Sequence, residues 1–223
     1  MLICRDEIDQ MSKSYRANFI NGLSGYKSAN LLGTTSRSGQ TNLSIINSVF
    51  HLGAHPPLMG FICRPHSVDR HSLDNILDTG SYTFNHVHTE MIEQAHQTSA
   101  RYPREQSEFD ACGFEPAWLE DCKAPFVSDC RIKIGLNYVE HHTLLNETVM
   151  VIGEVMLVGL PPEGVSDDGA LDISRADADA CGGLDTYFYG QKIKRVSYAK
   201  PDRPPQDFYG IHQRVCSGDA RDR

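Results

Sequence analysis

The sequence predicts a mainly β protein, a closed antiparallel barrel with a few peripheral helices. Short runs rich in β-branched and apolar residues recur along the chain, Gly, Pro, Ser and Asn separate them, and no alternation of strands with long helices is visible. The chain has 223 residues. Since all-β barrels often reach about 200–250 residues, one main domain is expected. The composition, 40% hydrophobic and 22% charged, is that of an ordinary globular protein.

The first predicted element is a helix near the N-terminus. Apolar residues recur there at helical spacing, at Ile8, Met11, Tyr15 and Phe19. The spacing predicts one helix from about residue 5 to 19, with an apolar stripe that packs on the barrel. We therefore divide the chain into an N-terminal helix (1–22), a barrel domain (23–200) and an extended C-terminal tail (201–223).

The strands come next in the chain. Runs with strand composition or period-two alternation cover residues 29–35, 43–50, 58–63, 81–87, 131–140 and 148–159. Two helical segments interrupt them. The first runs from Ser72 to Thr79 and ends at Gly80; the second, from Glu90 to Ala100 with a polar continuation to Asp110, is expected to be exposed. Residues 161–180, rich in Pro, Gly, Asp and Ala, predict a long loop with a short helix.

Charge and cysteine content restrict the class of protein. Lys plus Arg number 21 against 29 Asp plus Glu, a net charge of −8, which argues against a nucleic-acid partner because cationic contacts to phosphate supply most of that affinity. The N-terminus reaches charged residues before any signal-length apolar run, and we expect no membrane association. Seven cysteines without a C-x-x-C pair are typical of reduced thiols, so we expect a cytoplasmic protein without a zinc ribbon.

A cluster of cationic groups stands out in this acidic chain. It comprises Arg64, His66, Arg70 and His71, directly before Ser72. Ser72 opens a helix whose first N–H groups lack partners, and a guanidinium at such a terminus is well suited to a phosphate. The pattern predicts an anion pocket. The alternative is that the arginines pair with surface carboxylates and that Ser72 only caps its helix.

A second polar group lies on a predicted hairpin. Thr34 and Thr35 precede a polar turn at 36–40, and the return arm carries Asn42, Ser44, Asn47 and Ser48. Amide and hydroxyl donors of this kind suit a polar heteroaromatic ring. The alternative is a Ser- and Asn-rich turn that satisfies its own backbone.

Taken in order, these segments carry a family resemblance. The motifs are Tyr26-Lys-Ser-Ala-Asn-Leu-Leu-Gly-Thr34, Gly39-Gln-Thr-Asn42 with Ser44, His55-Pro-Pro57, Arg70-His-Ser-Leu-Asp-Asn-Ile76 and Gly80-Ser-Tyr-Thr-Phe-Asn85. This series resembles the flavin reductase-like, FMN-binding split-barrel family that includes flavoredoxin. The resemblance runs from about residue 15 to 160 and continues at 183–187 and 196–201.

The resemblance implies a Greek-key split barrel that forms a homodimer, with one FMN per subunit near the dimer interface. It places Asn42, Leu43, Ser44 and Ser48 against the isoalloxazine ring and ribityl chain, with Thr34 and Asn85 as further contacts to them. It places Arg70, His71 and Ser72 at the phosphate, and electrostatics adds Arg64. No protein side chain is expected to be catalytic, because the chemistry belongs to the flavin.

The function implied is an NAD(P)H-dependent FMN reductase that passes electrons to a small acceptor. Residues 98–104, with Glu105 and Phe109, are the candidate lid over the flavin; the alternative is an exposed helix with solvated charges. Members of the family place a His directly before the strand matching Val149–Val155, where this chain has Thr148, with His141 and His142 nearby. A flavoredoxin-like electron carrier that receives electrons from a protein therefore stays open.

Other classes have weaker signals. Histidine pairs at 51 and 55, 86 and 88, and 141 and 142 would need a third ligand to bind zinc, so a metal-binding β-barrel is kept only as an alternative and no metal residue is assigned. A calcium-loop match opening at Asp177 fails because its twelfth position is Phe188. There is no G-x-S-x-G, G-x-G-x-x-G or Walker motif, so any nicotinamide nucleotide binds without a Rossmann cradle.

Overall fold

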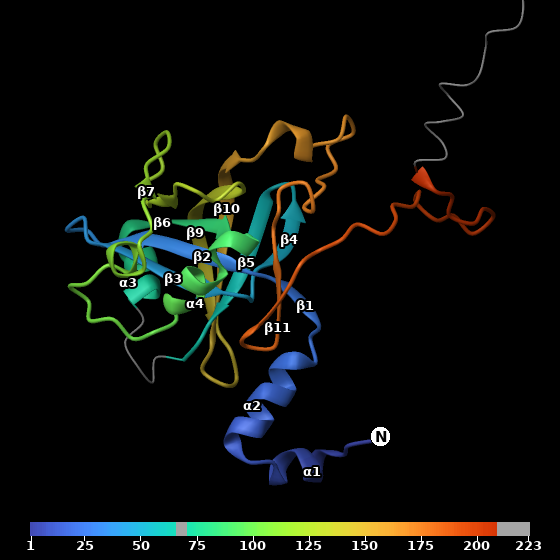
Figure 1. Ribbon diagram of the computed structural model, residues 1–223, viewed down its shortest axis with the longest axis horizontal. Helices are drawn as coiled ribbons and strands as arrows, with labels where there is room; N and C mark the ends of the chain where they lie inside the picture. Colours follow the sequence, from blue (N-terminus) through green and yellow to red (C-terminus); the bar gives the residue numbers. More distant parts are fainter. Residues whose placement is uncertain (66–70, 209–223) are drawn as a thin grey trace, which may run out of the picture. The chain divides into compact units, whose positions relative to one another are not determined.

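Seven antiparallel strands form the main sheet of the computed structural model (Figure 1). The structure describes residues 1–65 and 71–208. Their order is β3 (Thr41–Ile46), β2 (Asn30–Thr35), β6 (Ser81–His86), β9 (Lys133–Thr143), β10 (Val149–Gly159), β5 (Pro57–Cys63) and β4 (Phe50–Ala54). Two small sheets accompany it: β1 (Tyr26–Ser28) with β11 (Ala180–Gly182) and β12 (Thr186–Phe188), and β7 (Pro116–Ala117) with β8 (Phe126–Val127). The prediction of a mainly β fold is confirmed.

The described helices are short. They are α1 (Arg5–Gln10), α2 (Lys13–Gly22), α3 (His71–Thr79), α4 (Ile92–Gln97) and α5 (Glu108–Cys112), with 3₁₀ turns η1 (Thr89–Met91) and η2 (Pro162–Gly164). The prediction for α3 is confirmed, and Gly80, which ends it, has φ +72°, a left-handed conformation that glycine adopts without strain. No helix in the described ranges is both long and apolar enough to cross a bilayer.

The hydrogen-bonded ladder stays open between β3 and β4. Within the described ranges, these two strands are the edges of the sheet, which corrects the closed barrel expected from strand spacing alone. Ser48 connects the two sides: its hydroxyl accepts from the Ile62 N–H (3.2 Å) and donates to the Ile62 carbonyl (2.9 Å). The barrel is thus split, as the family resemblance implies.

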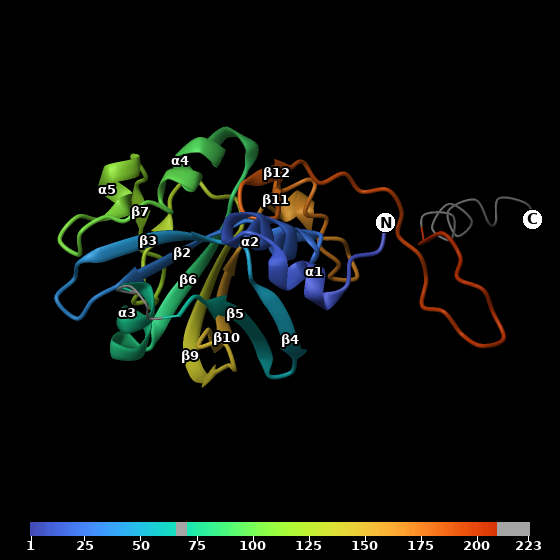
Figure 2. The same ribbon diagram turned by 90° about the horizontal axis from the view of Figure 1, so that it is seen from below.

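Two apolar cores lie on opposite faces of β2. Leu32 packs into the first core with Phe61, Tyr82 and Phe84, which α3 closes with Leu73 and Ile76. Neighbouring Leu31 points the other way, into a core that contains Leu43, Ala95 and Phe109. Figure 2 shows the resulting layers: α3 lies on one side of β2 and β3, and α4 and α5 lie on the other.

The predicted strand at 43–50 is wrong as a single element, because the chain leaves the sheet between β3 and β4. Asn47 donates through Nδ2 to the Gly183 carbonyl (2.9 Å), and Ser48 bonds Ile62. These side-chain bonds replace ladder bonds at the turn. The other predicted runs correspond to β2, β5, β6, β9 and β10, and the 161–180 loop contains η2.

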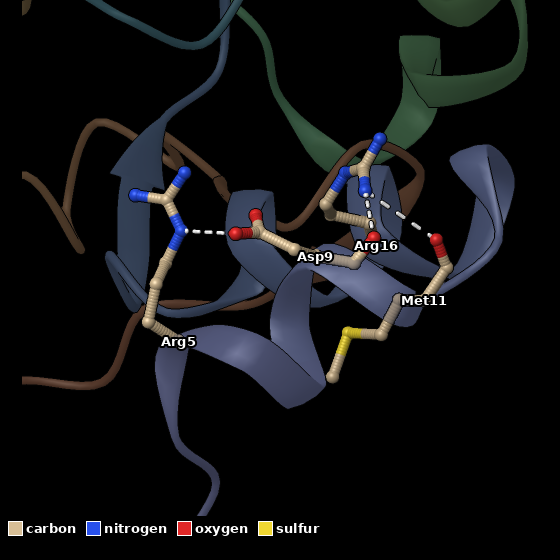
Figure 3. Close-up of polar contacts among 4 residues, drawn as sticks. All are labelled: Arg5, Asp9, Met11 and Arg16. Atoms are coloured by element: carbon tan, nitrogen blue, oxygen red, sulfur yellow. Dashed lines mark hydrogen bonds and ion pairs between the residues drawn. The ribbon is translucent and has the colours of Figure 1, made fainter.

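The single N-terminal helix predicted for 5–19 is also wrong in detail, because it breaks at Met11 and Ser12. The Ser12 hydroxyl accepts from the Tyr15 N–H (3.4 Å) and so caps α2. Figure 3 shows how Arg16 joins the two helices by donating to the carbonyls of Asp9 (3.1 Å) and Met11 (3.4 Å). No residue of α1 or α2 is buried, so the structure gives the predicted apolar stripe no buried contact with the barrel.

Residues 191–208 belong to a second compact unit, separate from residues 1–190. Within it, the Ser197 N–H donates to the Gln206 carbonyl (2.9 Å), and the Arg195 guanidinium lies 4.0 Å from the centre of the Phe208 ring. The described part of this unit therefore forms a local hairpin-like turn held by polar and cation–π contacts.

Candidate functional site

Three predicted site residues meet between β3 and α3. The Asn42 Nδ2 donates to the Ser72 Oγ (2.9 Å), and the Ser44 and Ser72 hydroxyls lie 3.1 Å apart. Asn42 and Ser44 are two positions apart on β3, so strand alternation turns both side chains toward the start of α3. Residues 28 and 30 positions apart in the chain thus form one polar cluster.

One cationic group lies at the C-terminal end of β5, and another lies at the start of α3. Arg64 directly follows β5 and is exposed, and His71, the first residue of α3, is half-buried. The first N–H groups of α3 have no partner within the helix and can bind an anion. Arg70, the central residue of the predicted phosphate site, lies outside the described residues together with His66.

Ser48 takes a different position from Asn42 and Ser44. Its hydroxyl bonds the backbone of Ile62 on β5, so it attaches the segment between β3 and β4 to β5 beside the split of the barrel. Its predicted flavin contact remains a prediction.

Thr34, Leu43 and Asn85 lie in the framework behind the polar cluster. All three are fully buried. The amide of Asn85 donates to the Leu31 carbonyl (3.1 Å) and accepts from the Val127 N–H (2.9 Å), and the Thr34 hydroxyl accepts from Asn75 Nδ2 (3.1 Å). The three residues therefore support the polar cluster from behind, and their expected contact with the flavin remains a prediction.

The segment 98–112 is attached to the edge of β3. The Ile45 N–H donates to the Thr98 hydroxyl (2.8 Å), and the Thr41 and Ser107 hydroxyls lie 2.7 Å apart. Phe109 is 1% exposed and packs in the second core. The expectation of an exposed helix to Asp110 is therefore wrong at its end, because β3 needs partners on its outer edge. The lid role of 98–104 remains a prediction.

Glu108 is a functional candidate that the sequence did not reveal. Its carboxylate accepts from the Leu43 backbone N–H (2.9 Å), and the residue is 7% exposed. Burial raises the pKa of Glu108, while the bond from Leu43 and the charge of His71 act in the opposite direction. The one feature of the neighbouring sequence that indicates the start of this helix is Ser107, which caps α5 by accepting from the Phe109 N–H (3.2 Å).

A cavity of about 470 Å³ adjoins the polar cluster. It shares Asn42 and His71 with the predicted flavin site. Its walls come from the β2–β3 turn, α3 and the segment before α5: Ser36, Arg37, Ser38, Gln40, Thr41, Asn42, His71, Asn75, Asp78, Arg104 and Glu105. The site therefore has a hollow beside it whose rim carries two arginines.

The β9–β10 turn shows where Thr148 lies. Its hydroxyl donates to Asn146 Oδ1 (2.7 Å) within the turn. His142 lies opposite Met150, and Val149 lies opposite Cys63, one residue before Arg64. Thr148 directly precedes β10, and the Leu144 N–H donates to its carbonyl (2.8 Å). The register therefore pairs His142 with Met150 rather than with Thr148.

The histidine pairs do not assemble a metal site in the part of the chain that the structure describes. No group of three His, Cys, Asp or Glu side chains there is close enough to share an ion. His86 ends β6 and its pKa is lowered to about 4 by burial, so it is neutral at pH 7. The metal-binding alternative thus has no geometric support from the described residues.

Sequence and structure comparisons assign the chain to a family. Residues 23–177 match the family described as "Flavin reductase like domain", more than half of the chain. The chain therefore belongs to the flavin reductase-like family, and its fold is the split barrel of that family. It is a flavoprotein of the flavin-related oxidoreductase class.

Individual solved structures are similar to the chain over most of its length. It is similar to a protein from Shewanella frigidimarina NCIMB 400 described as "putative flavin reductase with split barrel domain", with 50% identity over 89% of this chain and 100% of that chain and a TM-score of 0.86. Two more distant structures share the fold. Nitrilotriacetate monooxygenase component B from Bacillus cereus has 14% identity over 87% of this chain and 98% of its own, with a TM-score of 0.78. Flavoredoxin of Desulfovibrio vulgaris (Miyazaki F) has 20% identity over 79% and 91%, with a TM-score of 0.64.

A curated relative aligns over a shorter stretch. An uncharacterized protein of Aquifex aeolicus (strain VF5) is 23% identical over 127 residues, 56% of this chain. The alignment spans 64% of the length of that relative.

Proposed function

We propose that this chain binds FMN at the β3–α3 cluster and acts as an NAD(P)H-dependent flavin reductase that passes electrons to a small acceptor. The observation that carries the proposal is the meeting of Asn42, Ser44 and Ser72 within 2.9–3.1 Å, in a chain of the flavin reductase-like family. The similarity to the Shewanella protein described as a flavin reductase supports the same activity.

The residues present fit a flavin mononucleotide. Amide and hydroxyl groups of Asn42, Ser44 and Ser72 suit the ribityl hydroxyls, and Arg64, His71 and the first N–H groups of α3 suit a phosphate. Asn75, which lines the adjoining cavity, is 3% exposed, and its Oδ1 has no hydrogen-bond donor among the described residues. This oxygen can therefore accept a hydrogen bond from a ligand. The bound flavin would supply the two-electron chemistry.

The protein's own part is binding and orientation. Asn42 and Ser44, held on the edge strand β3, fix the donors in place, and α3 presents its positive end to the phosphate. The resemblance adds a homodimer, which we keep as part of the proposal. The His that family members carry before β10 is replaced by Thr148, which favours an electron carrier fed by a protein as the second candidate.

The test starts with the absorption spectrum of the purified protein during titration with FMN. Anaerobic NADH or NADPH should bleach the flavin band. Bleaching with dithionite alone would support the carrier instead, and failure to bind FMN would contradict both candidates.

A matched pair of variants tests the placement. Ser72→Ala should weaken FMN binding by about 1.5–3 kcal/mol, the range for a hydrogen bond to a charged group. Ser174→Ala is the control, because its hydroxyl bonds Asp172 (2.6 Å) in the 161–180 loop. Equal FMN dissociation constants for the two variants would rule out Ser72 as a ligand.

A further inference from the structure

Glu108 contacts the backbone of the strand that carries two side chains of the polar cluster. Its carboxylate accepts from the Leu43 N–H (2.9 Å), and Leu43 stands between Asn42 and Ser44 on β3. Glu108 is 7% exposed. Because a buried carboxylate is unfavourable unless it is hydrogen-bonded, the bond to Leu43 is the feature that explains an acid at this place. The contact therefore connects a buried acid with the two residues that flank its partner.

The position of β3 in the sheet makes this contact important. β3 is an edge strand, so a neighbouring strand, β2, holds its backbone on one side only. On the other side, the Leu43 N–H is bound by the Glu108 side chain. A strand with one strand partner opens locally more readily than a strand with two. The acceptor at this edge therefore decides how firmly Asn42 and Ser44 are held.

The start of α5 fixes Leu43 at two points. Glu108 binds its backbone N–H, and the next residue, Phe109, packs in the same core as the Leu43 side chain. Side chains alternate between the two faces of a strand. With Leu43 directed into that core, the side chains on either side of it turn to the opposite face, where both bond Ser72.

We propose that Glu108 is a positioning residue of the flavin site: through the Leu43 N–H, its carboxylate oxygen holds β3 so that Asn42 and Ser44 present their polar groups to one bound ligand. This role rests on the proposed function, since the ligand is the FMN assigned to the cluster. It depends on the length of the side chain and on its acceptor oxygen. Burial raises the pKa of Glu108 and the charge of His71 opposes that rise, so an effect of the carboxylate charge on the site is the alternative.

Three variants of the full-length protein separate the acceptor from the charge. Glu108→Gln keeps the length and an acceptor oxygen without the charge, Glu108→Asp keeps the charge on a side chain one methylene shorter, and Glu108→Ala removes both. In calorimetric titration with FMN at pH 7, the glutamine variant should stay within about threefold of the wild-type dissociation constant. The alanine and aspartate variants should each bind about tenfold more weakly, the effect of one lost hydrogen bond. The reverse order, with aspartate like wild type and glutamine like alanine, would overturn the proposal.

Asp179→Ala is the matched control for the loss of a buried carboxylate. Asp179 is 3% exposed, and its hydrogen bonds run to Thr89, Ala29 and Val87 rather than to β3. This variant should bind FMN like wild type, and thermal unfolding of each variant shows how far the fold is weakened. If Asp179→Ala and Glu108→Ala weaken FMN binding alike, the effect is a general loss of stability and the positioning role is wrong.

Amide hydrogen exchange of the flavin-free protein, read at Leu43 by NMR, measures the hold on β3 without FMN. Exchange should be about tenfold faster or more in Glu108→Ala and Glu108→Asp, and close to wild type in Glu108→Gln. Faster exchange with unchanged FMN affinity would leave Glu108 a stabilising residue only and overturn the proposal. Failure of the wild-type protein to bind FMN would contradict the proposed function, and the exchange rates would then decide by themselves whether Glu108 holds the cluster.

Discussion

The two edges of the main sheet are protected in different ways. On β3, the outward N–H groups of Leu43 and Ile45 are taken by the Glu108 carboxylate (2.9 Å) and the Thr98 hydroxyl (2.8 Å). In the described residues, β4 pairs only with β5, and a register shift interrupts that pairing between His51 and Gly53. A short, irregular strand is a poor template for further pairing. The comparison teaches that the edge carrying the site is held by side chains, while the other edge is left short and bulged.

The largest effect is expected from removing the partner of Leu43. Glu108→Ala leaves a buried N–H without an acceptor and should lower the free energy of unfolding by about 1–3 kcal/mol. Glu108→Gln keeps an acceptor oxygen and should stay within about 1 kcal/mol of wild type at pH 7. Urea denaturation of both variants gives the two values. If alanine and glutamine cost the same, the bond to Leu43 does not hold the edge.

The pH dependence of stability should show a smaller effect at the same residue. Burial raises the pKa of Glu108, so in the window above its ordinary value the folded state binds more protons than the unfolded state. The corresponding stability is present at pH below the ordinary carboxyl value and is lost as the pH rises through the folded value. Wild type should therefore lose stability relative to Glu108→Gln as the pH rises above the ordinary carboxyl value of about 4. Parallel pH profiles for the two proteins would contradict this.

The smallest effect is expected on β4. Leu52 is 44% exposed, so Leu52→Lys should change the free energy of unfolding by no more than about 0.5 kcal/mol. Sedimentation of the same variant measures its oligomeric state. A loss well above that figure, together with dissociation, would show that a second copy covers β4 in solution and that the contrast between the edges holds only for one chain.

The elements that carry the candidate site were predicted best where residues share a short stretch of chain. Asn42 and Ser44 are two positions apart on a strand, and His71 and Ser72 begin a helix that Gly80 ends, so local periodicity and turn chemistry predicted the strand and the helix that hold them. Their meeting across 28 to 30 positions follows the family motif order rather than any local rule. The burial of Asn85 could not be predicted in this way, because it depends on bonds to Leu31 and Val127 on other strands.

Glycine at position 33 illustrates the same limit. The composition of residues 29–35 predicts a strand, but not that a Cβ at Gly33 would lie 2.2 Å from the Pro125 carbonyl oxygen. That approach involves a segment more than 90 positions away, so only the folded chain reveals why a side chain is excluded there. Glu108 is comparable, since its bond to Leu43 spans 65 positions.

The sequence by itself determined the β-rich architecture, the helix α3 that follows the predicted phosphate-binding cluster, and the family. These features depend on the spacing of apolar residues and on turn residues, both of which act over a few positions. The tertiary structure alone decided that Ser48 bonds β5 beside the split of the barrel, that Glu108 protects β3, and that Arg37 and Arg104 come to the wall of one cavity. Each of these depends on which distant segments pack together, and packing is a property of the whole chain.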